Sequence, residues 1–136
     1  MYDAGMSFGL GEDIEALRES VRRFAAERIA PQAAEIDRSD QFPMDLWRKF
    51  GELGVLGITV PEQYGGAGMD YLSEALAFEE IGYADSSVRT TLSVQMSLVE
   101  LTILNWGTEE QKQKFLPKLC SGEWIGCFGL TEPNAG

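Results

Sequence analysis

The apolar positions near the start of the chain recur every three or four residues, which is the spacing of one face of an amphipathic α-helix. In residues 12–30 this face contains Ile14, Leu17, Val21, Phe24, Ala25 and Ile29. Glu12 and Asp13 suit the first turn, because the helix dipole favours negative charge there. Pro31 is expected to kink or end the helix, with a short helical continuation over residues 32–40.

A second helix is predicted to begin at Pro43, because the fixed φ of proline suits the first helical position. Its apolar stripe consists of Leu46, Trp47, Phe50 and Leu53. Gly54 is expected to end this helix in the left-handed conformation. Residues 55–70 carry Pro61 and four glycines. We therefore expect an irregular connection there, held against the core by its apolar residues.

Two further helices are predicted in the next forty or so positions. Asp70 is expected to cap a helix that runs to about Ala84. Its apolar positions are Leu72, Ala75, Leu76 and Phe78. Ser86 or Ser87 is expected to cap the following helix, which Gly107 ends. The apolar positions of that helix are Val88, Leu92, Val99, Ile103 and Trp106.

The last predicted helix begins near Glu109, because Thr108 and Gln111 have the spacing of a capping box. Pro117 is expected to break this helix into two pieces or to bend it, since proline lacks the backbone N–H that a helix interior uses. Gly122 is expected to close the segment.

The pattern then changes to a period of two. Residues 123–131, EWIGCFGLT, place apolar or small side chains on both faces, which is typical of a strand buried on two sides. A strand needs neighbours to complete its ladder. The chain is therefore predicted to be an all-α domain over residues 1–122, followed over residues 123–136 by the first strand and loop of a β-domain whose other strands are missing.

Composition removes several classes of function. The chain has 136 residues, 22 acidic and 11 basic, for a net charge of −11 that disfavours binding to nucleic acid or anionic lipid. It has no histidine, which excludes imidazole metal sites and histidine-based triads, and no metal site is predicted. No apolar run is long enough to cross a membrane. Cys120 and Cys127 are expected to be two buried, reduced thiols, as in the cytoplasm or a mitochondrial matrix.

Several motifs occur in one order along the chain. The sequence ends in GLTEPNAG, which matches eight consecutive positions of a longer signature. Residues 24–37 (FAAERIAPQAAEID), 60–71 (VPEQYGGAGMDY) and 105–126 (NWGTEEQKQKFLPKLCSGEWIG) add three further motifs. Together they resemble the acyl-CoA dehydrogenase family. The glycines within residues 60–71 do not form a dinucleotide fingerprint, because Tyr71 stands where the third glycine belongs, and we expect a sharp structural corner there.

This resemblance implies an FAD-dependent oxidoreductase that acts on CH–CH bonds in fatty-acid or amino-acid catabolism. In the family, a carboxylate removes the α-proton of an acyl-CoA thioester while the β-hydrogen leaves as hydride to the flavin. That carboxylate comes from a C-terminal helical domain that this sequence lacks, so no catalytic residue is assigned and this chain alone is expected to be inactive. The resemblance also implies an electron-transfer flavoprotein as acceptor and a homotetramer. An acyl-CoA oxidase-like flavoenzyme and a non-catalytic helical interaction module are the alternatives.

The same resemblance implies which residues lie at the cofactor. The backbone and hydroxyl groups of Phe128, Leu130 and Thr131 would follow the pyrimidine edge of the flavin, with the Thr131 hydroxyl near N1 and O2. Glu132 would have a structural or electrostatic role. The cofactor-binding residues assigned in this way are Phe128, Gly129, Leu130, Thr131, Glu132, Pro133, Asn134, Ala135 and Gly136.

Different parts of the sequence point to different acyl chains for the substrate. Residues 88–136 resemble glutaryl-CoA dehydrogenases, in which an arginine at the position of Arg89 faces the distal carboxylate, with a small hydroxyl residue at the position of Thr90. Both are therefore candidate substrate-binding residues, although those enzymes carry a glutamate where this chain has Gly82. The front half of the chain resembles isovaleryl-CoA dehydrogenases. The sequence therefore predicts the reaction and leaves the acyl chain open.

Overall fold

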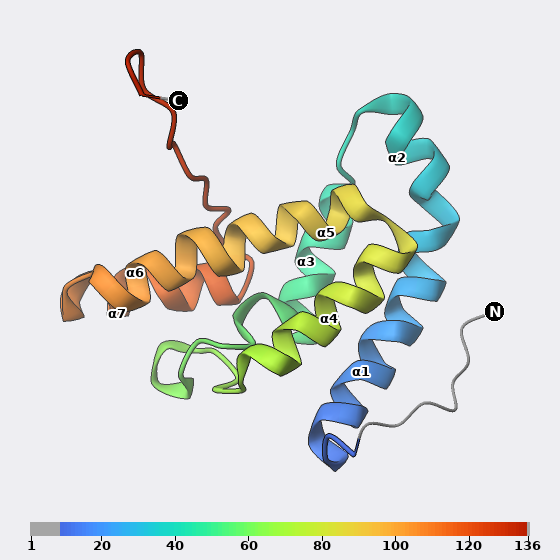
Figure 1. The fold of residues 1–136 in the computed structure, drawn as a ribbon, viewed down its shortest axis with the longest axis horizontal. Coiled ribbons are helices and arrows are strands. Elements are labelled where there is room, and N and C mark those ends of the chain that lie inside the picture. Colours follow the sequence, from blue (N-terminus) through green and yellow to red (C-terminus); the bar gives the residue numbers. More distant parts are fainter. Residues whose placement is uncertain (1–8, 136) are drawn as a thin grey trace.

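The computed structural model describes residues 9–135, and every regular element within that range is helical. The elements are α1 (Glu12–Phe24), η1 (Ala25–Ile29), η2 (Ala30–Gln32), α2 (Ala33–Ser39), α3 (Met44–Leu53), η3 (Val55–Gly57), η4 (Glu62–Tyr64), α4 (Tyr71–Ala84), α5 (Ser86–Ser93), η5 (Val94–Glu100), α6 (Leu101–Trp106) and α7 (Glu109–Cys120). In Figure 1, α1 and α4 lie side by side, and α7 lies along α6. The predicted all-α class is confirmed.

The first predicted helix is interrupted near Pro31 by turns of other helical types and then resumes. After α1 the backbone passes through a π-helical turn and a short 3-10 turn that contains Pro31, and it resumes as α2. This is the kink and short continuation that the sequence predicts. Asp40 then ends α2 in the left-handed conformation, at φ 53°.

The second helix and the connection after it also follow the prediction closely. Pro43 is the N-cap of α3, one position before the helix, and Gly54 ends the helix at φ 78°. The connection over residues 55–69 is irregular but buries most of its apolar side chains. Its corner depends on Gly66, because a Cβ atom there would lie 2.0 Å from the carbonyl oxygen of Val60. The glycines within this segment therefore form a structural corner, as expected.

The predicted cap of α4 is confirmed, whereas α5 has a different cap from the predicted one. Asp70 caps α4, and its Oδ1 accepts a hydrogen bond from the Ser73 backbone N–H at 2.9 Å. The cap of α5 is Asp85 rather than Ser86 or Ser87, so that prediction is wrong. The Asp85 carboxylate accepts from two backbone N–H groups of the first turn, which a serine hydroxyl at the next position does not do here. α5, η5 and α6 then form one continuous helix over residues 86–106, which we call the long helix (Figure 1).

The last helix passes through its proline. The capping box of Thr108 and Gln111 is present at the start of α7. The helix runs unbroken to Cys120, so of the two predicted effects of Pro117, a break or a bend, the break does not occur. Leu116, Leu119 and Cys120 are buried, and their packing holds the final turn where proline removes one hydrogen bond.

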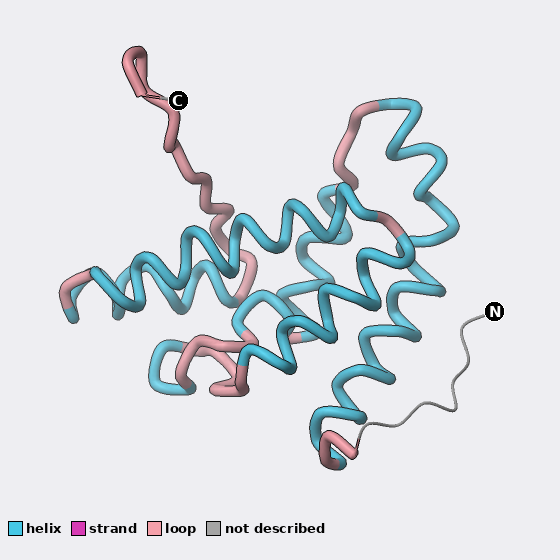
Figure 2. The backbone as a smooth tube through the Cα atoms, in the orientation of Figure 1, coloured by secondary structure: helices cyan, strands magenta, loops and turns pink. Residues whose placement is uncertain are grey.

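No strand is present between residues 9 and 135. Figure 2 shows residues 123–135 as a loop that leaves the helices, and we call residues 124–130 the exit segment. No other described segment pairs with it, so the predicted strand lacks the ladder that would define it. An isolated antiparallel bridge joins Glu132 and Ala135 in a tight turn. The predicted boundary at residue 122, between the helical domain and the β-domain, stays a prediction.

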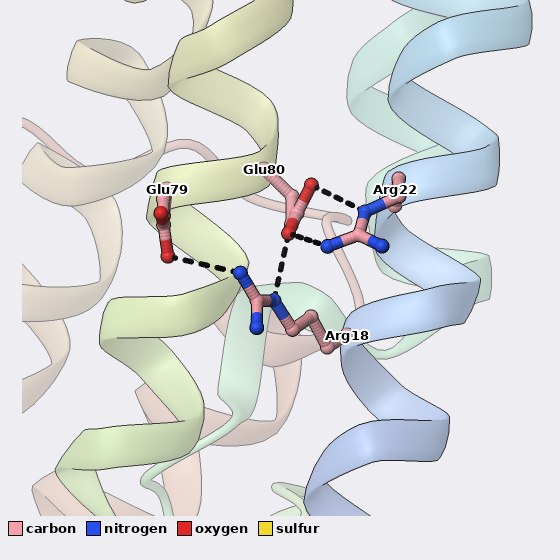
Figure 3. Close-up of polar contacts among 4 residues, drawn as sticks. All are labelled: Arg18, Arg22, Glu79 and Glu80. Carbon is pink, nitrogen blue, oxygen red and sulfur yellow. Dashed lines mark hydrogen bonds and ion pairs between the residues drawn. The ribbon is translucent and has the colours of Figure 1, made fainter. Parts of the chain in front are cut away.

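The inward face of α4 differs from its predicted apolar face. Leu72, one of the predicted apolar positions, is 43% exposed, whereas Glu74 and Glu80 are buried. The difference arises because partners on other helices compensate the buried carboxylates. For Glu80 these partners are Arg18 and Arg22 of α1, which point at it from the neighbouring helix (Figure 3).

Distances within this cluster are short. The Glu80 carboxylate accepts from Arg18 Nε at 2.8 Å, from Arg22 Nη2 at 2.7 Å and from Arg22 Nε at 3.0 Å. Arg18 also forms an ion pair with Glu79 at 3.5 Å. Burial alone would raise the pKa of Glu80, but the hydrogen bonds and charges of the two arginines outweigh it and lower the pKa. The cluster therefore joins α1 to α4 as a set of ion pairs inside a largely apolar interface.

We predict that Glu80→Ala lowers the free energy of unfolding by about 3–5 kcal/mol, because it leaves arginine charge buried without its partner. Urea unfolding followed by circular dichroism measures this change. Arg38→Ala is the matched control, since it removes an exposed ion pair with Glu35 on α2 and should change stability by less than about 1 kcal/mol. Equal effects of the two substitutions would contradict the interpretation.

A second buried carboxyl group has no such compensation. Glu100 of the long helix is 1% exposed, and its Oε1 has no hydrogen-bond partner. Burial, and secondarily the charge of Glu74, raise the pKa of Glu100 to about 9. Glu74 is also buried, and its Oε1 accepts from the Ser97 hydroxyl at 2.8 Å. The folded chain therefore holds Glu100 protonated at neutral pH.

This protonation makes stability depend on pH. The unfolded chain loses the Glu100 proton near its ordinary pKa of 4.5, but the folded chain keeps the proton until about pH 9. Between these values the folded state binds more protons, so stability falls as pH rises, by at most about 1.4 kcal/mol per pH unit. We predict that Glu100→Gln stabilises the chain at pH 8 more than at pH 5 in urea unfolding. Glu110→Gln, at an exposed position on α7, should show no such trend.

Candidate functional site

The exit segment is anchored where it leaves α7. Its first residue, Trp124, donates its backbone N–H to the Lys118 carbonyl at 3.0 Å. The Trp124 ring lies against Phe115, with ring centroids 6.0 Å apart, and the Lys118 ammonium lies 4.6 Å from the Trp124 ring centroid. Lys118 also bonds Glu123 at 2.9 Å. These contacts fix the direction in which the chain departs from the last helix.

A buried side chain of the long helix holds the next part of the segment. Gln95 is 1% exposed, and its amide bonds three backbone groups. Its Nε2 donates to the carbonyls of Leu119 at 3.2 Å and Trp124 at 3.3 Å, and its Oε1 accepts from the Gly126 N–H at 2.7 Å. The Gln95 amide thus bonds Leu119 near the end of α7 and two alternate residues of the exit segment. These three backbone groups are therefore held beside the long helix.

Gly126 lets the backbone approach this helix closely. A Cβ atom at Gly126 would lie 2.5 Å from Val99 Cγ1, so any side chain there would push the exit segment away. The glycine and the Gln95 amide therefore act together: one removes the steric barrier and the other supplies the hydrogen bonds.

Just beyond Gly126 the backbone finds no partner among the described residues. Within the described part of the chain, hydrogen bonds of the segment stop at Gly126 and resume only in the Glu132–Ala135 turn. Phe128 is partly exposed and Leu130 is 72% exposed. Gly136, the last predicted cofactor residue, lies outside the described residues. Residues 127–131 thus present N–H and C=O groups that no described residue bonds, which is the arrangement that a cofactor edge or a neighbouring strand can use.

The two thiols differ. Cys120 is buried, as predicted, but Cys127 is exposed on the exit segment, so the prediction of two buried thiols is wrong for Cys127. Both are free. Burial, and then the charge of Glu100, raise the pKa of Cys120 to about 12.

The candidate substrate residues lie in the first turns of α5. Arg89 Nη2 donates to the Thr90 hydroxyl oxygen at 3.2 Å, and that hydroxyl donates to the Ser86 carbonyl at 2.8 Å. The Arg89 stem packs beside Gly82 of α4, where a Cβ atom would lie 3.4 Å from Arg89 Cδ. No hydrogen bond joins Arg89 or Thr90 to the described part of the predicted cofactor residues, 128–135. The structure therefore orients Arg89 but does not bring it to the cofactor segment.

A hollow on the described surface lies away from these residues. It has a volume of about 430 Å³ and lies between the end of α1 with η1 and the end of α4, beside Arg22 and Glu80. None of its lining residues is a predicted cofactor or substrate residue. Within residues 9–135, no helix combines the length and hydropathy that crossing a bilayer requires. In the same range no cluster of three or more acidic or cysteine side chains is placed to hold a metal ion.

Sequence reasoning did not single out Gln95. A signal was present, because Gln95 stands three residues after Leu92 and seven after Val88, on the predicted apolar face of the long helix. A polar residue at such a position must find hydrogen-bond partners in the core. The pattern alone does not say that these partners are backbone groups of the exit segment.

A family model described as the acyl-CoA dehydrogenase N-terminal domain matches residues 11–123. A probable acyl-CoA dehydrogenase of Bacillus subtilis is 47% identical over 131 residues, covering 96% of this chain and 34% of that protein. The mitochondrial isovaleryl-CoA dehydrogenase of Pongo abelii is 46% identical over 130 residues, covering 94% of this chain and 31% of that protein.

Solved structures of acyl-CoA dehydrogenases are also similar to this chain. The crystal structure of a glutaryl-CoA dehydrogenase from Mycobacterium smegmatis in complex with FADH2 superposes with a TM-score of 0.87 at 42% identity, covering 93% of this chain and 33% of that one. The chain thus spans about a third of the length of each relative. Relatives of both the isovaleryl and the glutaryl type are similar to it, as the sequence motifs predict. This chain belongs to the acyl-CoA dehydrogenase family, whose N-terminal helical domain it matches.

Proposed function

We propose that this chain is the N-terminal part of an FAD-dependent acyl-CoA dehydrogenase that catalyses the α,β-dehydrogenation of an acyl-CoA thioester. The observation that carries the proposal is the family match over residues 11–123, followed by an exit segment whose backbone beyond Gly126 has no partner among the described residues. The relatives are about three times as long as this chain, so the activity belongs to the longer polypeptide.

The exit segment suits a flavin edge. Residues 127–131 offer backbone donors and acceptors that nothing in the described chain uses, and the Thr131 hydroxyl adds one more. The pyrimidine edge of a flavin presents alternating acceptors and one donor, which such a segment can bond in parallel. FAD, when bound, supplies the hydride acceptor for the reaction. The residues of this chain would hold and orient its ring, with Phe128, Leu130 and Thr131 nearest to it.

No carboxylate of this chain is assigned as the catalytic base. Glu74, Glu80 and Glu100 are buried within the helical core, and Glu80 is already bonded to two arginines. Glu132 lies in the terminal turn, where its backbone pairs with Ala135. The base would come from a later part of the polypeptide. Acyl-CoA as substrate, an electron-transfer flavoprotein as acceptor, a homotetramer and a cytoplasmic or matrix location complete the proposal.

For the acyl chain, we propose that Arg89 contacts the distal end of the substrate. The Thr90 hydroxyl bonds both the Arg89 guanidinium and the Ser86 carbonyl, which limits the directions that the guanidinium can take. A bidentate pair with a carboxylate would favour dicarboxylic acyl groups over branched ones. Gly82 departs from the glutamate that the glutaryl-CoA dehydrogenases carry at this position, and it leaves the Arg89 stem beside a small residue.

The complete reading frame that encodes this chain should give a yellow protein with bound FAD that dehydrogenates acyl-CoA thioesters. The 136-residue chain alone should bind no flavin after purification, because it offers only one edge of the site. Absorption spectra and a dye-reduction assay measure both. A complete product without flavin or turnover would contradict the enzyme and favour a helical interaction module. Rapid reaction of the reduced complete product with oxygen would favour an acyl-CoA oxidase.

We predict that Arg89→Ala in the complete protein lowers kcat/KM for glutaryl-CoA by roughly tenfold to a hundredfold, the range for losing hydrogen bonds to a charged group. Turnover of straight-chain thioesters should change little. Arg48→Ala is the matched control, since Arg48 is an exposed arginine on α3. If glutaryl-CoA turnover is unaltered in the Arg89 variant, the role assigned to Arg89 is wrong.

A further inference from the structure

We propose that Gln95 is a positioning residue that sets the register of the exit segment and thereby decides which backbone groups face the flavin. The identity of the flavin rests on the proposed function. The hydrogen bonds of Gln95 do not, because they join residues of this chain to one another.

The Gln95 amide makes the hydrogen bonds that a residue of a neighbouring strand would make. In a parallel β-ladder, a single residue donates its N–H to the carbonyl of one residue of the neighbouring strand and accepts at its carbonyl from the N–H of the residue two positions further on. The Gln95 amide does the same with the exit segment, donating to the Trp124 carbonyl at 3.3 Å and accepting from the Gly126 N–H at 2.7 Å. Its second donor bond, to the Leu119 carbonyl, fixes which end of the amide is nitrogen.

This pairing selects one edge of the segment. In extended backbone, residues two apart direct their N–H and C=O groups to the same edge. Phe128 and Leu130 share the parity of Trp124 and Gly126, so the edge bonded by Gln95 is the edge that continues at Phe128 and Leu130. A slip by one residue would present Cys127 and Gly129 instead and would turn every side chain to the opposite face.

Steric contact supports the same register. Only Gly126 brings the segment close enough to the long helix, because a Cβ atom there would meet Val99 at 2.5 Å. A one-residue slip would place Ile125 or Cys127 against Val99, and both carry side chains. The glycine and the buried amide therefore specify one alignment between the helix and the cofactor segment.

Amide hydrogen exchange, followed by NMR on the 136-residue chain, tests the hydrogen bonds without flavin. The Gly126 amide should be protected, whereas the amides of residues 127–130 should exchange fast. In Gln95→Leu, Gly126 should exchange at least about tenfold faster, while protection in α1 and α4 is kept. Gln113→Leu, which removes an exposed glutamine on α7, is the matched control and should leave Gly126 unchanged.

Three results would overturn the proposal. Fast exchange of Gly126 in the parent chain would do so even if the variant failed to fold. Unchanged Gly126 exchange in Gln95→Leu would also do so. An equal loss of protection at all amides would show that Gln95 serves general stability and no specific register.

The link to the cofactor is tested in the product of the complete reading frame. There, Gln95→Leu should reduce FAD retention by roughly tenfold relative to Gln113→Leu. Undiminished retention would overturn the positioning role. If the unsubstituted product binds no flavin, the proposed function fails, and the exchange results still report separately on the hydrogen bonds of Gln95.

Discussion

The long helix over residues 86–106 is the constraint on which the rest of the structure depends. It contacts α4, the connection at η3 and α7, and it also receives the exit segment. One helix therefore packs against the apolar core with Val88 and Leu92 and bonds backbone groups with Gln95. Because the same helix carries Arg89 near its start, any shift of the long helix would move both the core contacts and the candidate functional residues together.

Buried polar groups distinguish this core from a simple apolar one. Glu80 is compensated by two arginines, Gln95 by three backbone groups, and Glu100 by keeping its proton. Each solution meets the same requirement, since an unpaired charge or polar group in the interior is unfavourable. The consequence differs: the first joins two helices, the second directs the segment that leaves the domain, and the third links stability to pH.

Most features that depend on neighbours in the sequence were predictable, although the Asp85 cap of α5 was not. The Asp70 cap, the box of Thr108 and Gln111 and the left-handed Gly54 each involve residues within one helical turn, so their spacing is sufficient. Features decided between distant segments were not. The inward face of α4 depends on α1, and the role of Gln95 depends on a segment about thirty positions later. The predicted strand has no ladder partner among residues 9–135, so its alternating pattern stays a prediction.

The contrast between the two cysteines has a practical consequence. Cys120 is buried and its raised pKa keeps the thiol protonated, which makes it a poor nucleophile. Cys127 stands exposed, one residue beyond the last anchored position of the exit segment. A maleimide fluorophore would therefore attach selectively at this second thiol, and its anisotropy would report the motion of the exit segment.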